Sequence, residues 1–390
     1  MRKLLWIGDA VADTGFARCT HKTLEAVRKS WDVSVLGLNY RGDPHDYPYD
    51  IYPTFIHDGF GMGRLPEVID RVRPELIVVQ NDPWNLPAYM KALSNFPIVA
   101  AMPVDGLNCR GRTLNGIRLA IFWTQFGFEQ ARAGGYTGPA AIVPLGVDLD
   151  TYIPYDKHES RERVGLPEKY QQAFIVGNVN RNQPRKRLDL SIHYFAQWIK
   201  NFDVPDAYLF LHVAPTGESG VDCEQLASYY GIQNRLILSD PGIYKGIEER
   251  RLAQLYSTFD IQISTTQGEG WGLTTMEGMA CGIPQIVPNW AALGEWCEDA
   301  AYLVPCSTTA TTFDGINVIG GIPDRELFIL GLNSLYQDKP LYQELVDKGM
   351  RVVSQPQYRW ENVAQKFATA LEESLQIPYL QKKRKSLVAV

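Results

Sequence analysis

Short apolar runs alternate with helix-length amphipathic stretches along most of this 390-residue chain, and this alternation limits its possible folds more than any other feature. The first apolar run covers residues 3–7, and a helical pattern follows at 17–28. Further runs that indicate buried strands occur at 33–38, 76–80, 98–102, 120–123 and 141–144. A strand, a crossover helix and another strand are typical of a parallel sheet with helices on both faces.

The alternation stops at residues 148–168, where Pro, Asp, Glu and Lys predominate and we expect a linker. A second cycle then supplies strand-like runs at 173–176, 208–213, 236–238, 261–264 and 285–287, and helical patterns near 188–198, 223–230, 248–257 and 273–280. We therefore predict an α/β fold with two Rossmann-like domains facing each other, because the chain is too long for one ordinary core. In such sheets ligands bind at the carboxyl ends of the strands.

Composition narrows the possible partners and the compartment. The formal net charge is −6 and the isoelectric point is about 5.6, which argues against nucleic acid or an anionic membrane as the main partner. No stretch approaches the ~20 apolar residues of a membrane span, and Gly8 and Asp9 end the first apolar run too early for a signal peptide. The six cysteines form no CxxC pair, so we expect no zinc site and a reducing cytoplasm.

Residues 264–284 carry the most informative pattern, a strand end, a glycine-rich turn and a helix that begins near Leu273. A helix N-terminus offers unpaired backbone N–H groups and the positive end of the helix dipole. Glycines there allow a phosphate or a sugar hydroxyl to approach the backbone closely. The predicted donor-binding residues of this turn are Gly270, Trp271, Gly272, Leu273 and Thr274.

Two glutamates accompany this turn. Glu269 precedes the helix and could reach a sugar, and Glu277 lies eight positions later inside the helix, where its carboxylate could accept both hydroxyls of a ribose. An ordinary helix start with one surface glutamate is the alternative interpretation. The surrounding glycines favour a binding site.

A second pattern lies at residues 174–190, where a strand leads into a loop with four cationic side chains and then into a helix. Arg181 and Lys186 stand five positions apart and could hold one diphosphate from two sides, the arginine as a fork and the lysine as a point charge. Taken alone, a basic loop is more often simply solvated. Its place after a strand favours a diphosphate clamp.

The two patterns together resemble the retaining GT-B glycosyltransferases of family 4. The E-x7-E motif corresponds to Glu269 and Glu277, and the Arg and Lys five residues apart correspond to Arg181 and Lys186. Weaker similarities occur at residues 143–154, 255–260 and 358–360. The resemblance implies a GT-B fold with two Rossmann-like domains across a cleft, and a nucleotide-diphosphate sugar as the donor substrate, with no cofactor and no metal.

The resemblance also implies roles for individual residues. Arg181 and Lys186 would bind the donor phosphates, Glu269 would contact the transferred sugar, and Glu277 would bind the ribose. We expect an acceptor-side domain at residues 1–155 and a nucleotide-sugar domain at 156–373. We also expect a C-terminal helix at about 374–390 that packs back on the first domain.

Three positions depart from the family pattern. Arg187 follows the lysine where the family usually has glycine, and the loop after the first strand offers only Gly15 at its helix start for contact with the donor phosphate. Many members have an acceptor-side histidine after a mid-domain strand. Asp105 stands at the corresponding place here and is our fourth predicted catalytic residue, beside Arg181, Lys186 and Glu269.

The sequence is compatible with other functions. A GT-B sugar-nucleotide epimerase or a phosphorylase would share the fold and the phosphate site, and a non-catalytic nucleotide-sugar-binding protein would differ only in lacking turnover. The absence of G-x-G-x-x-G and of G-x-x-x-x-G-K-[ST] argues against a nicotinamide dehydrogenase and a P-loop NTPase. The acceptor could be a glycan, a lipid, a small molecule or a hydroxylated base in DNA, and the oligomeric state is open.

Overall fold

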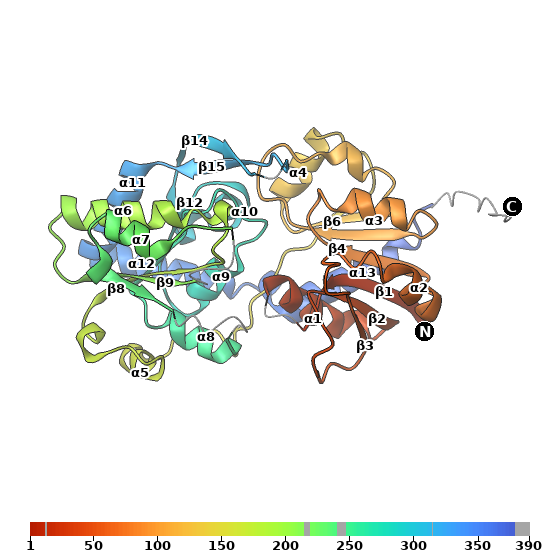
Figure 1. Ribbon diagram of the computed structural model, residues 1–390, viewed down its shortest axis with the longest axis horizontal. Helices are drawn as coiled ribbons and strands as arrows, with labels where there is room; N and C mark the ends of the chain where they lie inside the picture. The colour runs from red at the N-terminus through yellow and green to blue at the C-terminus, as the bar shows by residue number, and fades with distance from the viewer. Residues whose placement is uncertain (12–13, 214–218, 240–246, 314, 379–390) are drawn as a thin grey trace, which may run out of the picture. The chain divides into compact units, whose positions relative to one another are not determined.

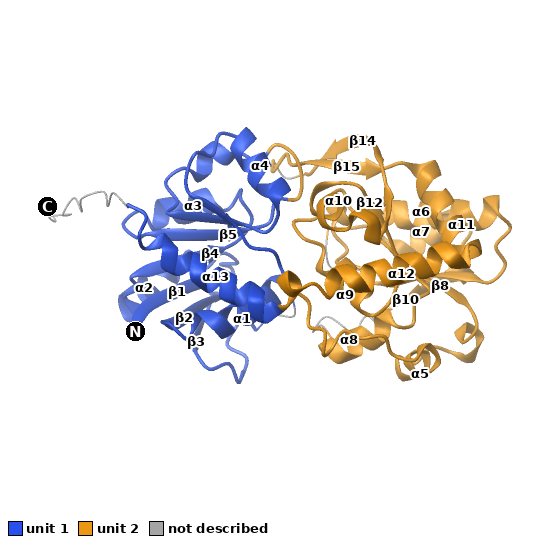
Figure 2. Ribbon diagram, turned by 180° about the vertical axis from the view of Figure 1, so that it is seen from behind, with its two compact units in different colours: residues 1–104, 109–145, 360–390 blue, residues 105–108, 146–359 orange. Residues whose placement is uncertain are grey.

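The computed structural model describes residues 1–11, 14–213, 219–239, 247–313 and 315–378. The chain divides into two compact units, shown in different colours in Figure 2. The first unit comprises residues 1–104, 109–145 and the chain from 360 onward, and the second comprises 105–108 and 146–359. The main segment of the second unit therefore begins at Gly146 and ends at Arg359, both earlier than the bounds of 155 and 373 that we expected from the sequence.

The first unit is built on a seven-stranded parallel sheet of order β3-β2-β1-β4-β5-β6-β7. Its strands are β1 (Arg2–Asp9), β2 (Trp31–Leu38), β3 (Asp50–Pro53), β4 (Leu76–Gln80), β5 (Ile98–Met102), β6 (Leu119–Phe122) and β7 (Ala140–Ile142). Its helices are α1 (Gly15–Val27), α2 (Leu65–Val72), α3 (Leu86–Ala92), α4 (Gln125–Ala133) and α13 (Trp360–Ser374), with a 3-10 turn at Gly111–Leu114.

Helix α13 brings the end of the described chain back to the first unit (Figure 1). The ring of Phe367 on α13 packs at 5.4 Å from Trp6 of β1. Beyond the helix, the Arg118 guanidinium donates to the carbonyls of Ser374, Leu375 and Ile377 at 2.6–2.9 Å. The C-terminal helix that belongs to the first unit is thus α13 at 360–374 and not the helix that we expected at about 374–390, because residues 375–378 are not helical; residues 379–390 lie outside the described part.

The second unit has a six-stranded parallel sheet of order β10-β9-β8-β11-β12-β13 and a separate antiparallel pair, β14-β15. Its strands are β8 (Phe174–Val179), β9 (Ala207–His212), β10 (Leu236–Leu238), β11 (Ile261–Ile263), β12 (Gln285–Pro288), β13 (Tyr302–Val304), β14 (Cys306–Thr311) and β15 (Ile319–Pro323). Its helices are α5 (Lys157–Arg163), α6 (Leu188–Asn201), α7 (Cys223–Tyr229), α8 (Glu249–Tyr256), α9 (Leu273–Ala280), α10 (Ala291–Trp296), α11 (Arg325–Gln337) and α12 (Lys339–Val353). Short 3-10 turns occur at Glu168–Tyr170, Pro184–Lys186, Gln233–Arg235, Glu298–Ala300 and Pro356–Tyr358.

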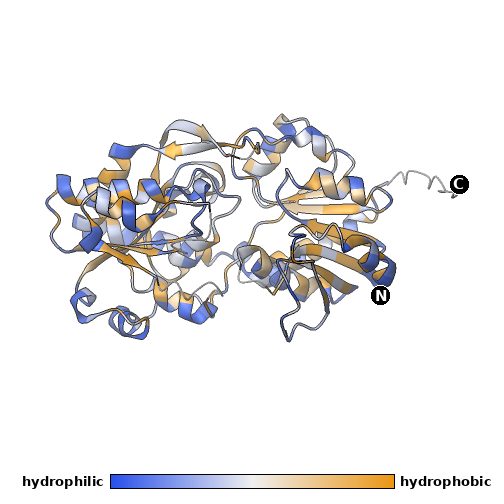
Figure 3. Ribbon diagram, in the orientation of Figure 1, coloured by the Kyte–Doolittle hydropathy of each residue, from blue (hydrophilic) through white to orange (hydrophobic). Residues whose placement is uncertain are grey.

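Each unit has its own hydrophobic core, formed where helices cover the sheet. The strands are mostly hydrophobic, as their orange colour in Figure 3 shows, and the central strand β4 is buried along its whole length. This pattern is typical of parallel strands that have helices on both faces. In the second unit β8 lies so close to Phe259 that a Cβ on Gly177 would stand 2.2 Å from the phenyl ring, so this strand position requires glycine.

Helix α5 occupies the stretch that we expected to be a linker. Its buried face carries Arg161 instead of an apolar stripe. The Arg161 guanidinium donates to the carbonyls of Tyr170, Gln171 and Thr258 at 2.8–3.1 Å and pairs with Asp260 at 2.9 Å. These bonds satisfy the buried charge and fasten the helix to the sheet.

Candidate functional site

The carboxyl end of β11 leads into a glycine-rich loop and then into helix α9, as the sequence predicts. Gly272 is the N-cap of α9 and has a φ of 94°, in the left-handed region that favours glycine. A Cβ there would also stand 2.5 Å from the Leu293 side chain. No side chain caps this helix start, so its first backbone N–H groups can serve an anion or a hydroxyl.

The predicted donor-binding residues 270–274 lie at this helix start, with Gly270, Trp271 and Gly272 buried and Leu273 and Thr274 half-buried. The indole of Trp271 stacks on Trp296 with ring centroids 5.6 Å apart, and the Trp296 Nε1–H donates to the Trp271 carbonyl at 2.7 Å. Its side chain therefore fixes the loop.

Four charged side chains meet beside this loop, and we call them the charge cluster: Asp105, Arg185, Lys186 and Glu269. Lys186 Nζ donates to Glu269 Oε1 at 2.5 Å. Arg185 NH1 lies 3.2 Å from the other Glu269 oxygen, and Arg185 Nε lies 3.2 Å from Asp105 Oδ2. The side chains of Lys186, Glu269 and Asp105 are only 8–12% exposed, so these are largely desolvated ion pairs.

The charge cluster consists of two basic and two acidic side chains, whose formal charges sum to zero. Burial by itself would raise the pKa of Glu269, but Lys186 and Arg185 outweigh burial and hold that pKa at about 2. Burial lowers the pKa of Lys186, which the neighbouring Arg185 also lowers and Glu269 opposes. Burial raises the pKa of Asp105, and the opposing attraction of Arg185 only partly offsets it. An incoming diphosphate would compete with the carboxylates for the two cations.

Asp105 belongs to a different unit from the one that the sequence suggested. We expected it in the acceptor-side domain, and it belongs to the second unit, in the short segment 105–108. Leu107 exchanges two backbone hydrogen bonds with Ile319 of β15, at 2.9 and 3.1 Å. Two glycines permit this close packing. A Cβ on Gly106 would stand 2.3 Å from the Ile319 carbonyl oxygen, and a Cβ on Gly268 would stand 1.8 Å from the Asp105 carbonyl oxygen.

The arginine in the charge cluster is Arg185, which sequence reasoning missed. The predicted Arg181 lies on an exposed part of the same loop. A 3-10 turn at residues 184–186 gives Arg185 and Lys186 their places beside the loop after β11, and Arg185 also donates to the Gly268 carbonyl at 2.5 Å. In the sequence, the position of Arg185 directly before Lys186 was the available signal for its role. Only the 3-10 turn shows that both side chains reach Glu269.

Glu277 occupies the second turn of α9 and is 3% exposed. Its Oε2 accepts a hydrogen bond from the Tyr256 hydroxyl of α8 at 2.8 Å. A carboxylate that is buried and oriented in this way can accept further hydrogen bonds from a ligand's hydroxyl groups. Gly15, the remaining predicted residue, belongs to the first unit, where it is the exposed first residue of α1 after the N-cap Thr14.

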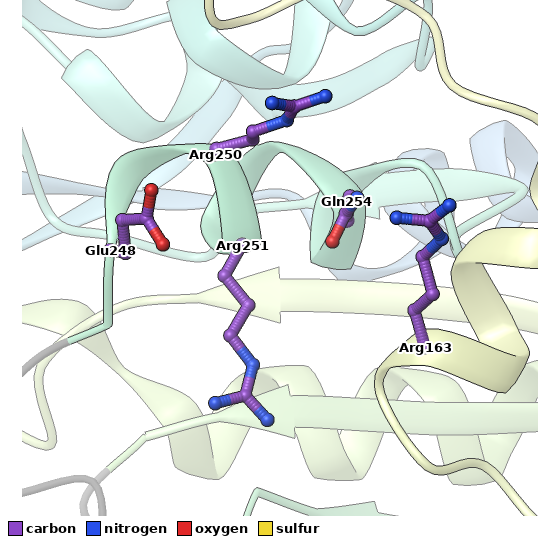
Figure 4. A pocket seen from close by; sticks show the side chains of 5 residues that line it. All are labelled: Arg163, Glu248, Arg250, Arg251 and Gln254. Carbon is purple, nitrogen blue, oxygen red and sulfur yellow. The ribbon is translucent and has the colours of Figure 1, made fainter.

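The structure offers two further observations on binding sites. Among the described residues, no three or more His, Cys, Asp or Glu side chains are grouped so that they could hold a metal ion. A hollow of about 450 Å³ lies on α5 and α8, lined by Arg163, Glu248, Arg250, Arg251 and Gln254. Figure 4 shows that the guanidinium groups of Arg250 and Arg251 point in different directions, so they do not converge on one ligand.

Part of the second unit is similar in sequence to known proteins. Residues 156–317 match the sequence model of the family described as glycosyl transferases group 1. The D-inositol 3-phosphate glycosyltransferase of Geodermatophilus obscurus is 33% identical over 158 residues, which are 39% of this chain and 33% of that protein. A second protein of that name, from Catenulispora acidiphila, is 32% identical over 43% of this chain and 38% of its own length. The matched part thus spans little more than a third of these relatives.

Solved structures extend the similarity to the whole fold. Sucrose-phosphate synthase from Thermosynechococcus elongatus is similar over 97% of this chain and 100% of its own, with a TM-score of 0.76 and 16% identity. HepE of Anabaena, in complex with UDP-glucose, is similar over 96% of this chain and 100% of its own, with a TM-score of 0.71 and 17% identity. In the described part of our chain, no helix is both long and apolar enough to span a membrane. The chain thus has the GT-B fold, and its residues 156–317 are similar in sequence to the glycosyl transferases group 1 family.

Proposed function

We propose that this protein is a retaining glycosyltransferase that moves a sugar from a nucleotide-diphosphate sugar to an acceptor hydroxyl. The observation that carries the proposal is the charge cluster beside the start of α9. Lys186 and Arg185 form a pair of cations for a diphosphate, and Glu269 is a carboxylate within 3.2 Å of both. Backbone N–H groups at the start of α9 add a second anion-binding element.

Each residue would act on a different part of the donor. Lys186 and Arg185 would hold the charge that develops on the leaving diphosphate, and Arg181 could join them from the exposed part of the loop. Glu277 would accept hydrogen bonds from the ribose, and Gly15 would approach the phosphate through its backbone. Glu269, once a phosphate takes over the cations, would accept hydrogen bonds from hydroxyls of the transferred sugar.

The transfer would proceed by positioning and charge stabilisation. The bond between the anomeric carbon and the diphosphate oxygen breaks, and the acceptor oxygen bonds to that carbon from the same face. The acceptor proton passes to the departing phosphate. The cations of the cluster would meet the charge of the leaving group, so the proposal needs no metal ion and no cofactor.

The comparisons suggest which donor and acceptor to try first. HepE was crystallised with UDP-glucose, and two relatives are named for glycosyl transfer to D-inositol 3-phosphate. We therefore propose a UDP-sugar as the first donor and a phosphorylated polyol among the first acceptors, beside glycans, lipids and hydroxylated bases in DNA. None of the six cysteines, all of which lie in the described residues, forms a disulfide, and we propose a reducing cytoplasm as the place of action.

The test is a screen of UDP-, GDP- and ADP-sugars for thermal stabilisation, followed by measurement of nucleotide release with and without acceptors. We expect one nucleotide class to stabilise the protein, and we expect release of nucleotide to persist in EDTA. NMR of the product should show that the anomeric configuration of the donor is kept. A donor that binds without any release of nucleotide would support a non-catalytic binding protein, and an inverted product would contradict the retaining mechanism.

A further inference from the structure

The residue that follows Lys186 has an unusual backbone conformation. Arg187 has φ 49° and ψ 47°, in the left-handed region, and it links the 3-10 turn at residues 184–186 to helix α6. A residue other than glycine is strained in this region, and such a conformation persists only where the surroundings hold it in place. The contacts of Arg187 therefore show what fixes the turn that carries Lys186.

A chain of hydrogen bonds ends on the Arg187 carbonyl. The Thr265 hydroxyl donates to it at 2.7 Å, and the backbone N–H groups of Leu190 and Ser191 donate to the same oxygen at 2.9 and 3.3 Å. Since the Thr265 proton is used there, the Ser191 hydroxyl must donate to Thr265 Oγ1 across their 2.6 Å contact. Asn178 Nδ2 donates to Ser191 Oγ at 2.9 Å, and Asn180 Nδ2 donates to Asn178 Oδ1 at 2.8 Å. Every donor thus points the same way, from β8 through α6 and the loop after β11 to the turn.

The middle of this chain is inaccessible to water. Asn178, Ser191 and Thr265 are each 0% exposed. A buried hydroxyl or amide that loses its partner keeps the cost of desolvation without compensation, so each member depends on the next. Apolar side chains would fill these positions without that risk. We therefore infer that these polar side chains do more than fill the core. Their hydrogen bonds end on the backbone carbonyl of Arg187, next to Lys186.

The same loop holds the turn at a second place. The Gln267 N–H donates to the Arg185 carbonyl at 2.9 Å. On the other side of Lys186, the Arg187 guanidinium makes a two-point ion pair with Asp189 at 2.8 and 2.9 Å. The backbone of Arg185 and Arg187 is thus fixed on both sides of Lys186. The Cα of Lys186 is therefore held at a defined position, from which its side chain reaches Glu269.

We propose that Thr265 and Ser191 are positioning residues for Lys186, which they hold in place through the left-handed carbonyl of Arg187. The proposal rests on the function assigned above, in which Lys186 stabilises the leaving diphosphate. A cation displaced by about 1 Å loses much of its effect on a transition state, whereas binding of a flexible donor tolerates the displacement better. Loss of the Thr265 hydroxyl should therefore lower kcat more than it raises KM.

The experiment compares two substitutions at one position. Thr265→Val keeps the shape and removes the hydroxyl, and Thr265→Ser keeps the hydroxyl. Thr258→Val is the matched control, because Thr258 is also 0% exposed and its hydroxyl also donates to a backbone carbonyl, that of Leu255 at 2.7 Å. We expect kcat for nucleotide release to fall about 10- to 100-fold in Thr265→Val with KM changed less than about threefold. Thr265→Ser and Thr258→Val should stay within about threefold of the native protein.

Equal losses in the valine and serine variants at 265, or an unchanged kcat in Thr265→Val, would overturn the proposal. Ser191→Ala provides a second variant if Thr265→Val does not fold, and it should show the same split between kcat and KM.

A crystal structure of Thr265→Val separates this inference from the proposed function, because it needs no turnover. We expect Arg187 to leave the left-handed region and Lys186 Nζ to move beyond about 4 Å from Glu269. A variant that keeps both features contradicts the inference, whatever the native protein does with nucleotide sugars.

Discussion

Replacement of Lys186 by methionine tests the central claim about the charge cluster. The methionine side chain is unbranched and of similar length, so it fills the same space without the charge. The cluster would change from neutral to a net charge of −1, with Arg185 left to serve both Asp105 and Glu269. Two effects follow: the folded protein loses an ion pair, and the leaving diphosphate loses a cation.

The size of each effect can be worked from the structure. Lys186 and Glu269 are 11% and 12% exposed, so an effective dielectric constant of about 20 is appropriate. Two unit charges at about 4 Å then interact by about 4 kcal/mol, which is roughly 10³-fold in rate if the whole amount develops in the transition state. Removal of one preorganised donor typically costs about 10²–10³-fold. For stability, loss of a hydrogen bond to a charged group costs about 1.5–3 kcal/mol.

A second substitution separates these effects. In the double variant Lys186→Met with Glu269→Gln the cluster is neutral again, so we expect urea unfolding to recover part of the stability lost in Lys186→Met. Nucleotide release should not recover, because the cation is still missing. The measurements are equilibrium unfolding and steady-state nucleotide release for the native protein, both single variants and the double variant. Recovery of turnover in the double variant, or a native rate in Lys186→Met, would refute this account of Lys186.

The remaining predictions concern other parts of the site and the fold. Glu277→Ala should weaken binding of the free nucleotide diphosphate by about 1.5–3 kcal/mol in calorimetry, and unchanged affinity would contradict the ribose assignment. Asp105→Asn should lower donor hydrolysis together with transfer, since Asp105 lies in the charge cluster. If only transfer to the acceptor is lost, Asp105 acts on the acceptor, as the sequence suggested. Arg161→Leu should cost about 3–5 kcal/mol in urea unfolding, because it breaks the buried side of the ion pair with Asp260, which keeps Lys157 at 2.7 Å, and leaves the carbonyls of Tyr170, Gln171 and Thr258 without their donor; it should leave nucleotide affinity unchanged. The pKa of Glu269 is about 2 in the folded protein and near 4.3 in the unfolded chain. The ionised Glu269 therefore contributes its full stabilisation above about pH 4.3, and this contribution is lost as the pH falls towards 2. Glu269→Gln should remove this part of the acid dependence of the unfolding free energy.

The parallel strands and the glycine-rich turn could be predicted because their physical signals are local. Strands β4, β5 and β10 and helix α9 occur at the predicted residues, since continuous apolar runs and a glycine before a helix are visible in any short window. Helix α5 could not be predicted in this way. Its only large buried side chain is Arg161, and a buried arginine makes sense only when the carbonyls of Tyr170 and Thr258 are known to surround it.

Parts of the site depended on contacts between distant segments. Arg185 and Arg181 look equivalent in the sequence, and only the 3-10 turn at 184–186 directs Arg185 to Glu269. Asp105 follows a strand of the first unit, but its segment pairs with β15, whose sequence Ile-Gly-Gly-Ile-Pro is a weak strand signal because it contains two glycines and a proline. Arg187 was a departure from the family's glycine. The structure shows that it keeps a glycine-like left-handed backbone, held by Thr265 and Asp189.

The neutrality of the charge cluster has a consequence for what the site can recognise. Two free cations would attract any phosphate, whereas here each cation already has a carboxylate at 2.5–3.2 Å. A ligand that takes Lys186 and Arg185 away from Glu269 leaves a buried carboxylate without a partner, which is costly. A free diphosphate incurs that cost in full. A nucleotide sugar can offset it, because hydroxyl groups of the sugar can donate to Glu269 while the diphosphate occupies the cations. In the proposed reaction, the ion pairs that hold the cluster together without ligand would therefore favour a donor with its sugar attached over the nucleotide product.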